Sequence, residues 1–441
     1  MADGLDLGRR RGYCDLPSVV AMATTHSPPR VEIIDALRGF ALLGIVLVNV
    51  GYFASAWHGL GLPDPAAQGP IDGPVAFLVK ALAETKFYLL FSLLFGYSFT
   101  IQMESARRAG RALAPAFSRR LLALFVLGAG HAVLLFNGDI LGTYALMGAV
   151  LLMLRNRSPR SAAQIAAAIL IVLAVAFALL SLVPQTSDPA AVAGSARELQ
   201  QGFRGSPGDV IDTRLAVLPH TLEDVLLPFQ APCALALFLL GLAAGKLRLL
   251  HHAAEHRALW RRLRAGGLLI GLPGGLLYAW GSGEMLEHPS RALLVAGADV
   301  LLAPALTAGL TAGAILILLS PRGRALRQWL APAGRMALTC YLTQSLVLAF
   351  VFTGYGAGLV GRVGAAASVA IALALFLVQL RLSRWWLARH RYGPLEWLLR
   401  WATTLQRPQR GADVEGDGHD APMVFGRRRR PSAATVIRPK T

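Results

Sequence analysis

The chain has 441 residues, of which 55% are apolar and 15% are charged, and the apolar share does not count its 45 glycines. Soluble domains average about 45–50% apolar residues with glycine included, and about 25% charged residues. The composition therefore excludes a soluble globule, a disordered chain and a fibrous repeat. It predicts an all-α, polytopic integral membrane protein whose partner is the lipid bilayer. The net charge of +18 fits basic cytoplasmic loops, and nucleic acid is not an expected partner.

Apolar runs near the ~20 residues that cross a bilayer define the predicted spans. Ten runs predict about ten transmembrane helices. They lie at residues 37–55, 86–103, 120–137, 140–154, 162–184, 225–245, 266–282, 294–319, 329–353 and 364–381. The fourth run is short and follows the tight turn Asn137-Gly138-Asp139, so the third and fourth runs are predicted to form a helical hairpin.

The distribution of Lys and Arg between the connecting segments predicts the orientation. With the N-terminus placed inside, the segments on the inner side carry 34 of these residues and those on the outer side carry 6. Basic residues concentrate in cytoplasmic loops. Both termini are therefore predicted to be cytoplasmic, in a multi-pass protein of the bacterial cytoplasmic (inner) membrane.

Changes in composition divide the chain into five parts. Residues 1–29 are predicted to be a disordered N-terminal extension. Two membrane halves, 30–184 and 225–404, flank an external loop at 185–224. Residues 405–441 form a basic tail that is also predicted to be disordered.

Ionisable and amide residues within the apolar runs are the candidate functional residues, because each is costly in lipid unless it is paired or hydrated. Asp35 and Arg38 are three residues apart and can pair on one helix face, with Asn49 further along the same run. Lys86 opens the second run, where it can extend to the interface. These four residues are candidates for substrate binding, and an ion pair at the headgroups is the alternative for Asp35 and Arg38.

His131 lies deepest in the predicted membrane. It follows Arg120 by eleven residues, which is ~16 Å along a helix and close to the bilayer midplane. A hydrogen bond to a neighbouring helix would explain such a residue, and catalysis is the other explanation. Asp139 follows at the outer end of the hairpin and is the candidate partner of His131.

The ninth run contains a second polar group. Arg335, Thr339 and Thr343 are spaced to share one helix face. Thr side chains can bond to their own helix, so Arg335, Tyr341 and Gln344 are the candidate substrate-binding residues here.

Glycines recur at four-residue spacing in two runs, at Gly241 and Gly245 and at Gly267, Gly271 and Gly275. Such faces allow helix backbones to approach closely. We expect close helix packing at both, within the chain or between the subunits of a homo-oligomer.

No bound cofactor or metal site is expected. His251, His252, Glu255 and His256 lie in an Arg-rich segment and do not follow the H-E-x-x-H order of a zinc site.

Five sequence blocks resemble the YeiB-like family of bacterial membrane proteins. They begin with Arg30-x-x-x-x-Asp35-x-x-Arg38-Gly39-Phe40 and Lys86-Phe87 through Phe95-Gly96. They continue with His131 through Gly138-Asp139 to Tyr144, Gly334-Arg335 through Tyr341 to Gln344-Ser345, and Gly393-Pro394-Leu395-Glu396-Trp397. The blocks occur in family order from about residue 30 to 404. The resemblance implies that the C-terminal half is a domain of unknown function.

The family is also distantly similar to membrane acyltransferases of the heparan-α-glucosaminide N-acetyltransferase type. That similarity implies transfer of an acyl group from cytoplasmic acyl-CoA to an extracytoplasmic sugar or similar acceptor, with a central histidine. In the acyltransferase the histidine lies in the loop after the first span, where this chain has His58. Either His131 or His58 is therefore the expected functional histidine.

The residues are compatible with such a reaction. Histidine supplies a base with a pKa near neutrality, and Asp139 could orient the His131 ring. Arg38 and Arg335 could bind the phosphates of acyl-CoA. We expect the first, third and ninth runs to converge on one polar cavity. The alternatives are a small-molecule transporter or permease, with Arg38, Lys86 and His131 lining its path, and a non-catalytic membrane scaffold.

Overall fold

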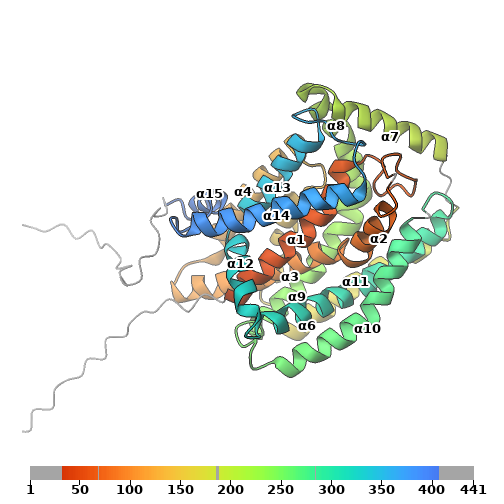
Figure 1. The fold of residues 1–441 in the computed structure, drawn as a ribbon. Coiled ribbons are helices and arrows are strands. Elements are labelled where there is room, and N and C mark those ends of the chain that lie inside the picture. The colour runs from red at the N-terminus through yellow and green to blue at the C-terminus, as the bar shows by residue number, and fades with distance from the viewer. Residues whose placement is uncertain (1–31, 68, 185–187, 284, 407–441) are drawn as a thin grey trace, which may run out of the picture. The chain divides into compact units, whose positions relative to one another are not determined.

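The computed structural model describes residues 32–67, 69–184, 188–283 and 285–406 (Figure 1). These residues form helices and no strand, which confirms the all-α fold. The first eight helices are α1 Glu32–Ala54, α2 Asp72–Leu82, α3 Lys86–Arg108, α4 Leu113–Leu134, α5 Leu141–Leu154, α6 Pro159–Leu180, α7 Pro189–Arg204 and α8 Pro207–His220. A π-helix, η1, then spans Thr221–Gln230. The remaining helices are α9 Ala231–Lys246, α10 Arg257–Ser282, α11 Pro289–Leu318, α12 Gly323–Arg335, α13 Ala337–Phe352, α14 Ala365–Leu387 and α15 Pro394–Thr404.

Several of these helices are long and apolar enough to cross a membrane. Among the described residues there are six such segments: α1, α4, α6, α11, α14 and the run from α8 through η1 to α9. The pair α12 and α13 makes a seventh if it is counted as one span. Each of the ten apolar runs falls on one helix or on two consecutive helices. The protein is therefore a polytopic helical membrane protein, while the count of ten and the placement of both termini stay predictions.

The ninth apolar run, residues 329–353, is not the single helix that its spacing predicts. The chain bends by 80° between α12 and α13. Arg335 ends the first helix and Thr339 lies in the first turn of the second, so they do not share a helix face. Glu396 of α15 explains the break, because its carboxylate accepts hydrogen bonds from the backbone N–H groups of Leu338 and Thr339, at 2.7 and 3.1 Å. These bonds satisfy the N-terminus of a new helix at this point.

Helix α1 lies inside the bundle and α6 lies at its edge. Of the 18-residue apolar stretch that could span the membrane, 61% is buried inside the protein in α1 and 11% in α6. Helix α1 packs against α3, α12, α13 and α14, while α9 packs between α3 and α6 (Figure 1). Helix α6 thus has the least buried apolar stretch among the candidate spans, and α1 supplies the core that positions the polar groups.

The glycine face of α10 packs directly on α11. A Cβ atom added at Gly271 would lie 2.3 Å from the backbone nitrogen of Leu306, and one at Gly267 would lie 2.6 Å from that of Gly309. Such distances leave no room for a side chain. The predicted close packing is confirmed, and it occurs within one chain.

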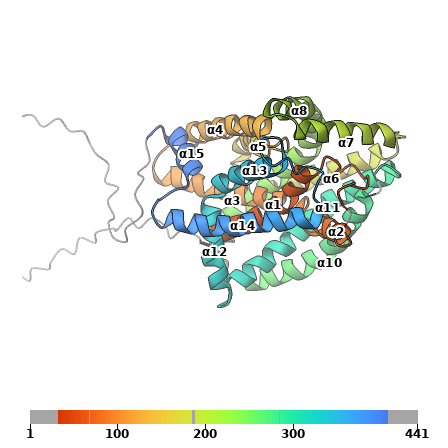
Figure 2. The ribbon, with the colours of Figure 1, turned by 45° about the horizontal axis from the view of Figure 1, so that its top comes forward.

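The segment 185–224, predicted as an external loop, contains helices α7 and α8, which lie at the edge of the bundle in Figures 1 and 2. Ser206 and Asp209 form a capping box at the start of α8. At the end of α7, the Arg204 side chain donates a hydrogen bond to the carbonyl oxygen of Val360 at 2.8 Å. The predicted disordered segments at both ends of the chain lie almost entirely outside the described residues.

Candidate functional site

His131 and Asp139 form a buried pair at the hairpin between α4 and α5. His131 lies in the last turn of α4, and Asp139 precedes α5 by two residues. Their side chains are 0% and 5% exposed, and Nδ1 of the histidine lies 2.8 Å from Oδ1 of the aspartate. The other carboxylate oxygen accepts a hydrogen bond from the N–H of Gly142 at 2.7 Å. The tight turn therefore brings the candidate acid and base together and also caps α5.

The second ring nitrogen of His131 is the atom that the Asp139 contact leaves over. When Nδ1 donates to the Asp139 carboxylate, Nε2 carries the free lone pair. This atom is buried and has no hydrogen-bond partner in the described part of the chain. The Tyr341 ring of α13 packs against the imidazole, with 5.0 Å between the ring centroids. A second candidate residue thus lies beside the histidine, from an element distant in the sequence.

A basic group occupies the opposite end of α4. Arg38 donates to Asp35 Oδ1 and to the hydroxyl of Ser98 on α3, both at 2.6 Å. The ion pair expected from their spacing is therefore formed. Arg120 lies close enough to interact electrostatically with Arg38, and its Nε is buried without a hydrogen-bond partner within the described residues. Because Arg120 and His131 lie on one helix, about 16 Å of helical rise separates this group from the histidine.

Arg335 lies on the same side of the bundle as Asp35. The backbones of α1 and α12 touch, since a Cβ at Gly334 would lie 1.8 Å from the carbonyl oxygen of Asp35. The Arg335 guanidinium donates to the carbonyl oxygen of Arg391 at 3.4 Å. The close approach of the two helices thus places both candidate CoA-binding arginines at the ends of neighbouring elements.

Lys86 is buried and does not extend to an interface. Its Nζ lies 3.0 Å from Asp299 Oδ1, and the two side chains are 0% and 1% exposed. The Thr85 hydroxyl donates to the other oxygen of Asp299 at 2.8 Å. Thr85 has φ of 65°, a left-handed conformation that is unusual for a β-branched residue. This backbone conformation directly precedes α3, and the Lys86 side chain points into the protein. The ion pair with Asp299 therefore stabilises its charge, in place of the water at the membrane interface that the sequence predicts.

Two residues of this cluster were missed by sequence reasoning, Asp299 and Glu84. The Tyr278 hydroxyl donates to Glu84 Oε1 at 3.1 Å, and the Tyr278 ring lies 4.7 Å from Lys86 Nζ. Asp299 is an acidic residue within the eighth apolar run, and that was a signal in the sequence that could have identified it.

His58, the alternative functional histidine, lies near this cluster, since it interacts electrostatically with Glu84. Its ring packs on Tyr52 with 4.4 Å between centroids, and its Nε2 is buried without a hydrogen-bond partner among the described residues. Burial lowers the pKa of His58 below its ordinary value, and the nearby Glu84 carboxylate opposes that shift. The two candidate histidines therefore belong to different polar groups.

Gln344 and Asn49 are the remaining candidate residues, and Gln344 connects two helices. Gln344 donates to Gln379 of α14 at 2.8 Å, which links α13 to α14. Asn49 is half-buried on α1. Within the described residues, no three His, Cys, Asp or Glu side chains come together as metal ligands.

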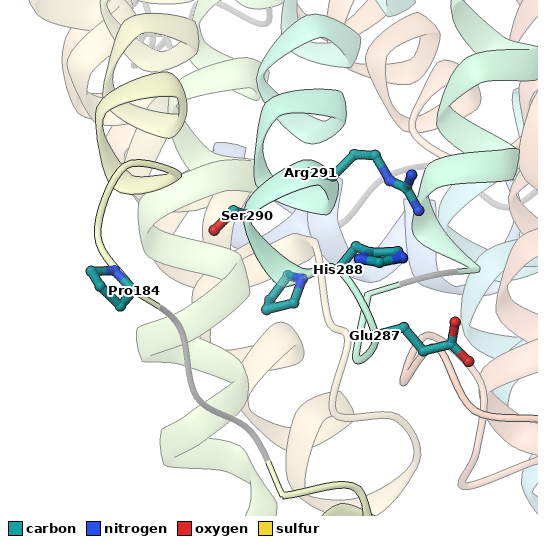
Figure 3. Close-up of a pocket in the computed structure, with 6 residues that line it drawn as sticks. Pro184, Glu287, His288, Ser290 and Arg291 are labelled. Atoms are coloured by element: carbon teal, nitrogen blue, oxygen red, sulfur yellow. The ribbon is translucent and has the colours of Figure 1, made fainter.

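Two cavities can be described, and neither is lined by His131, Arg38 or Arg335. The first, of about 420 Å³, lies at the start of α11 (Figure 3). It is lined by Pro184, Glu287, His288, Pro289, Ser290 and Arg291. The second lies at the ends of α3, α5 and α9. The single cavity expected between the first, third and ninth runs stays a prediction.

The apolar helices and their buried ionisable groups define a polytopic α-helical membrane protein. The chain belongs to the YeiB-like family, as comparisons with known proteins show. It is 33% identical to YxaH of Bacillus subtilis (strain 168) over 402 residues, which cover 87% of this chain and 97% of that protein. It is 28% identical to YeiB of Escherichia coli (strain K12) over 396 residues, 84% of this chain and 95% of YeiB.

The C-terminal half carries the domain that the resemblance implies. Residues 244–406 match the family described as "Protein of unknown function (DUF418)". A 39.9 kDa protein from the amylase 3′ region of Bacillus acidopullulyticus is 27% identical over 387 residues, 85% of this chain and 94% of that protein. No solved structure matches the chain. The relatives are described as uncharacterised, so a reaction has to be proposed from the site itself.

Proposed function

We propose that the protein transfers an acyl group from cytoplasmic acyl-CoA to a sugar or similar acceptor across the bacterial cytoplasmic membrane. The observation that carries this proposal is the buried His131–Asp139 pair with its unpartnered Nε2. An imidazole held at one nitrogen by a carboxylate presents the other nitrogen as a base. The resemblance to membrane acyltransferases supports the same reaction class. Acyl-CoA would be a co-substrate, and the proposal requires no resident cofactor.

The proposed reaction is a general-base acyl transfer. His131 Nε2 takes the proton of the acceptor hydroxyl or amine while the acceptor atom attacks the thioester carbonyl carbon. The C–S bond then breaks, and the CoA sulfur leaves with the proton that His131 returns. Asp139 holds the ring in one tautomer and stabilises the imidazolium between these steps. Arg38 and Arg335 would bind the CoA phosphates at the cytoplasmic side.

The full chain in sealed proteoliposomes provides the test. Acetyl-CoA is added on the cytoplasmic side and radiolabelled glucosamine on the other, and acetylated sugar and released thiol are measured. His131→Ala should abolish transfer while leaving acetyl-CoA binding and the thermal unfolding midpoint in place. Asp139→Asn should slow transfer by roughly 10²–10⁴-fold, because the amide no longer fixes the basic tautomer.

A matched control is His220→Ala, which removes an exposed histidine at the end of α8 and should leave transfer unchanged. Equal activity of His131→Ala and the wild type would overturn the proposed base. Loss of activity in His58→Ala alone would assign the reaction to the other polar group.

Transport is the second candidate function, and the buried Lys86–Asp299 pair is the observation that favours it. Ionisable residues within a membrane protein often mark a path for ions or solutes. Lys86 begins α3 just after the end of α2, and Glu84 in the connection between them interacts electrostatically with Asp299. Transport predicts that labelled glucosamine enters the vesicles unmodified when acetyl-CoA is omitted, and that Lys86→Met reduces its entry. Entry that requires acetylation would support acyl transfer instead.

A further inference from the structure

A basic cavity of about 660 Å³ lies at the ends of α3, α5 and α9, on the side predicted to be cytoplasmic. Six cationic side chains line it: Arg107, Arg108, Arg111, Arg155, Lys246 and Arg248. Glu104 is the acidic residue in its lining, and His251 completes the polar part. The cavity therefore has a large excess of positive charge.

Some of these cationic side chains already pair with other groups of the protein. Glu104 pairs with Arg108, and Arg248 donates to the same carboxylate at 2.7 Å. Lys246 Nζ donates to the carbonyl oxygen of Arg155 at 2.8 Å, and so satisfies the end of α5. One carboxylate thus serves two guanidinium groups, which leaves net positive charge even among the paired residues.

Arg107 and Arg111 supply positive charge that no other described group of the protein pairs with. In the part of the chain that the structure describes, neither side chain makes a hydrogen bond or an ion pair. Both are exposed, and they flank the end of α3 on one rim of the cavity. A guanidinium group offers a planar fork of donors that matches the oxygens of a phosphate.

Apolar side chains form an apolar wall of the same cavity. Ile101, Met103 and Leu113 line the same cavity, and Ile101 is 37% exposed. A cavity lined by both cationic and apolar side chains fits a molecule that carries a phosphate and an apolar portion.

We infer that this cavity is a binding site for a phosphate-bearing amphiphile, with Arg107 and Arg111 as its phosphate ligands. A phospholipid headgroup from the inner leaflet and the phosphates of a CoA thioester share this chemistry. The inference is independent of the role proposed for His131, because the residues and the cavity are different.

The test measures ligand affinity with the full chain purified in detergent. Three probes are titrated separately: inorganic phosphate, palmitoyl-CoA and phosphatidylglycerol, with diacylglycerol of the same acyl chains as the uncharged comparison that lacks a phosphate. The double variant Arg107→Gln/Arg111→Gln should weaken binding by about a hundredfold, since each of the two lost charge-assisted bonds is worth about tenfold. Arg107→Lys/Arg111→Lys should retain more affinity than the Gln pair, because the charge is kept.

The matched control is Arg261→Gln/Arg262→Gln, which removes two exposed arginines of α10 on the same predicted side. Preference for phosphatidylglycerol over palmitoyl-CoA would identify a lipid site, and the reverse would identify a thioester site. Tighter binding of inorganic phosphate than of either amphiphile would contradict the role of the apolar wall. Equal weakening by both Gln pairs, or no saturable binding of any probe by the wild type, would overturn the inference.

Discussion

At the scale of single residues, Lys86 and Asp299 neutralise each other in a fully buried position. Removing one partner leaves an uncompensated charge in a medium of low polarity, so we expect Lys86→Met to destabilise the protein by about 3–5 kcal/mol. The double variant Lys86→Met/Asp299→Leu should recover most of this loss, because no charge is left unpaired. Thermal unfolding of the wild type, Lys86→Met, Asp299→Leu and the double variant in detergent measures the coupling as a double-mutant cycle.

Lys80→Met on α2 is the matched control, since Lys80 is only half-buried. It should change stability by less than about 1 kcal/mol. A double variant as unstable as Lys86→Met would show that Lys86 stabilises the fold through contacts other than this ion pair.

His58 should make stability depend on pH. Burial lowers its pKa, so between the folded and unfolded pKa values the unfolded chain binds a proton that the folded chain does not. Stability therefore falls as the pH drops through the ordinary histidine pKa of about 6.5, by at most about 1.4 kcal/mol per pH unit. The unfolding midpoint of the wild type should decrease more between pH 7.5 and 5.5 than that of His58→Gln. Parallel pH profiles would contradict this assignment.

At the scale of elements, the contact between α10 and α11 depends on glycine. Gly271→Leu would place side-chain atoms where the backbone of Leu306 lies, so the helices must separate. We expect a loss of a few kcal/mol in stability, measured by thermal unfolding in detergent. Gly266→Leu is the control on the same helix, because nothing lies within 4 Å of a Cβ at Gly266. Equal effects of the two substitutions would refute the role of the glycine face.

The bend between α12 and α13 depends on Glu396 of α15. Its carboxylate binds two backbone N–H groups at the start of α13 and the hydroxyl of Thr339, at 2.6 Å. Glu396→Gln removes the charge from this cap, and we expect a loss of about 1–2 kcal/mol in thermal unfolding experiments. Glu255→Gln, at an exposed position, should have no measurable effect. A Glu396 variant as stable as the wild type would assign the bend to helix packing alone.

At the scale of the whole molecule, the excess of basic residues predicts the topology. Reporter fusions after residues 210 and 441 should report an external and a cytoplasmic position, respectively. The physical reason is that Lys- and Arg-rich segments stay on the cytoplasmic side during insertion. The same signal from both fusions would contradict the predicted orientation and, with it, the assignment of the basic cavity to the cytoplasmic side.

The polar residues of the molecule are separated into groups instead of being scattered. The His131–Asp139 pair lies near one end of α4, and the Arg38–Arg120 group lies near the other. In the acyl transfer that we propose, Arg38 would bind phosphate at one group and His131 would act as the base about 16 Å further along the α4 direction. This arrangement is the reason for preferring acyl transfer over transport among the proposals.

Features that depend on local spacing could be predicted from the amino-acid sequence. Apolar composition and run length predicted a helical membrane protein, because a bilayer leaves the backbone few other ways to satisfy its hydrogen bonds. The three-residue spacing of Asp35 and Arg38 predicted their ion pair, and the tight turn before α5 made Asp139 the candidate partner of His131. These contacts join residues that are near in the chain, so helix and turn geometry largely decide them.

Contacts between distant segments could not be predicted from the sequence, because they depend on how the helices pack. Lys86 and Asp299 are 213 residues apart, and nothing in either local sequence states which helices become neighbours. The bend after Arg335 likewise depends on Glu396, which reaches back to α13 from a separate helix. In both cases a polar group is satisfied by a partner that packing brings near. The free-energy cost of a buried charge, or of unpaired backbone N–H groups at the start of a helix, therefore depends on the whole fold and not on the neighbouring residues in the sequence.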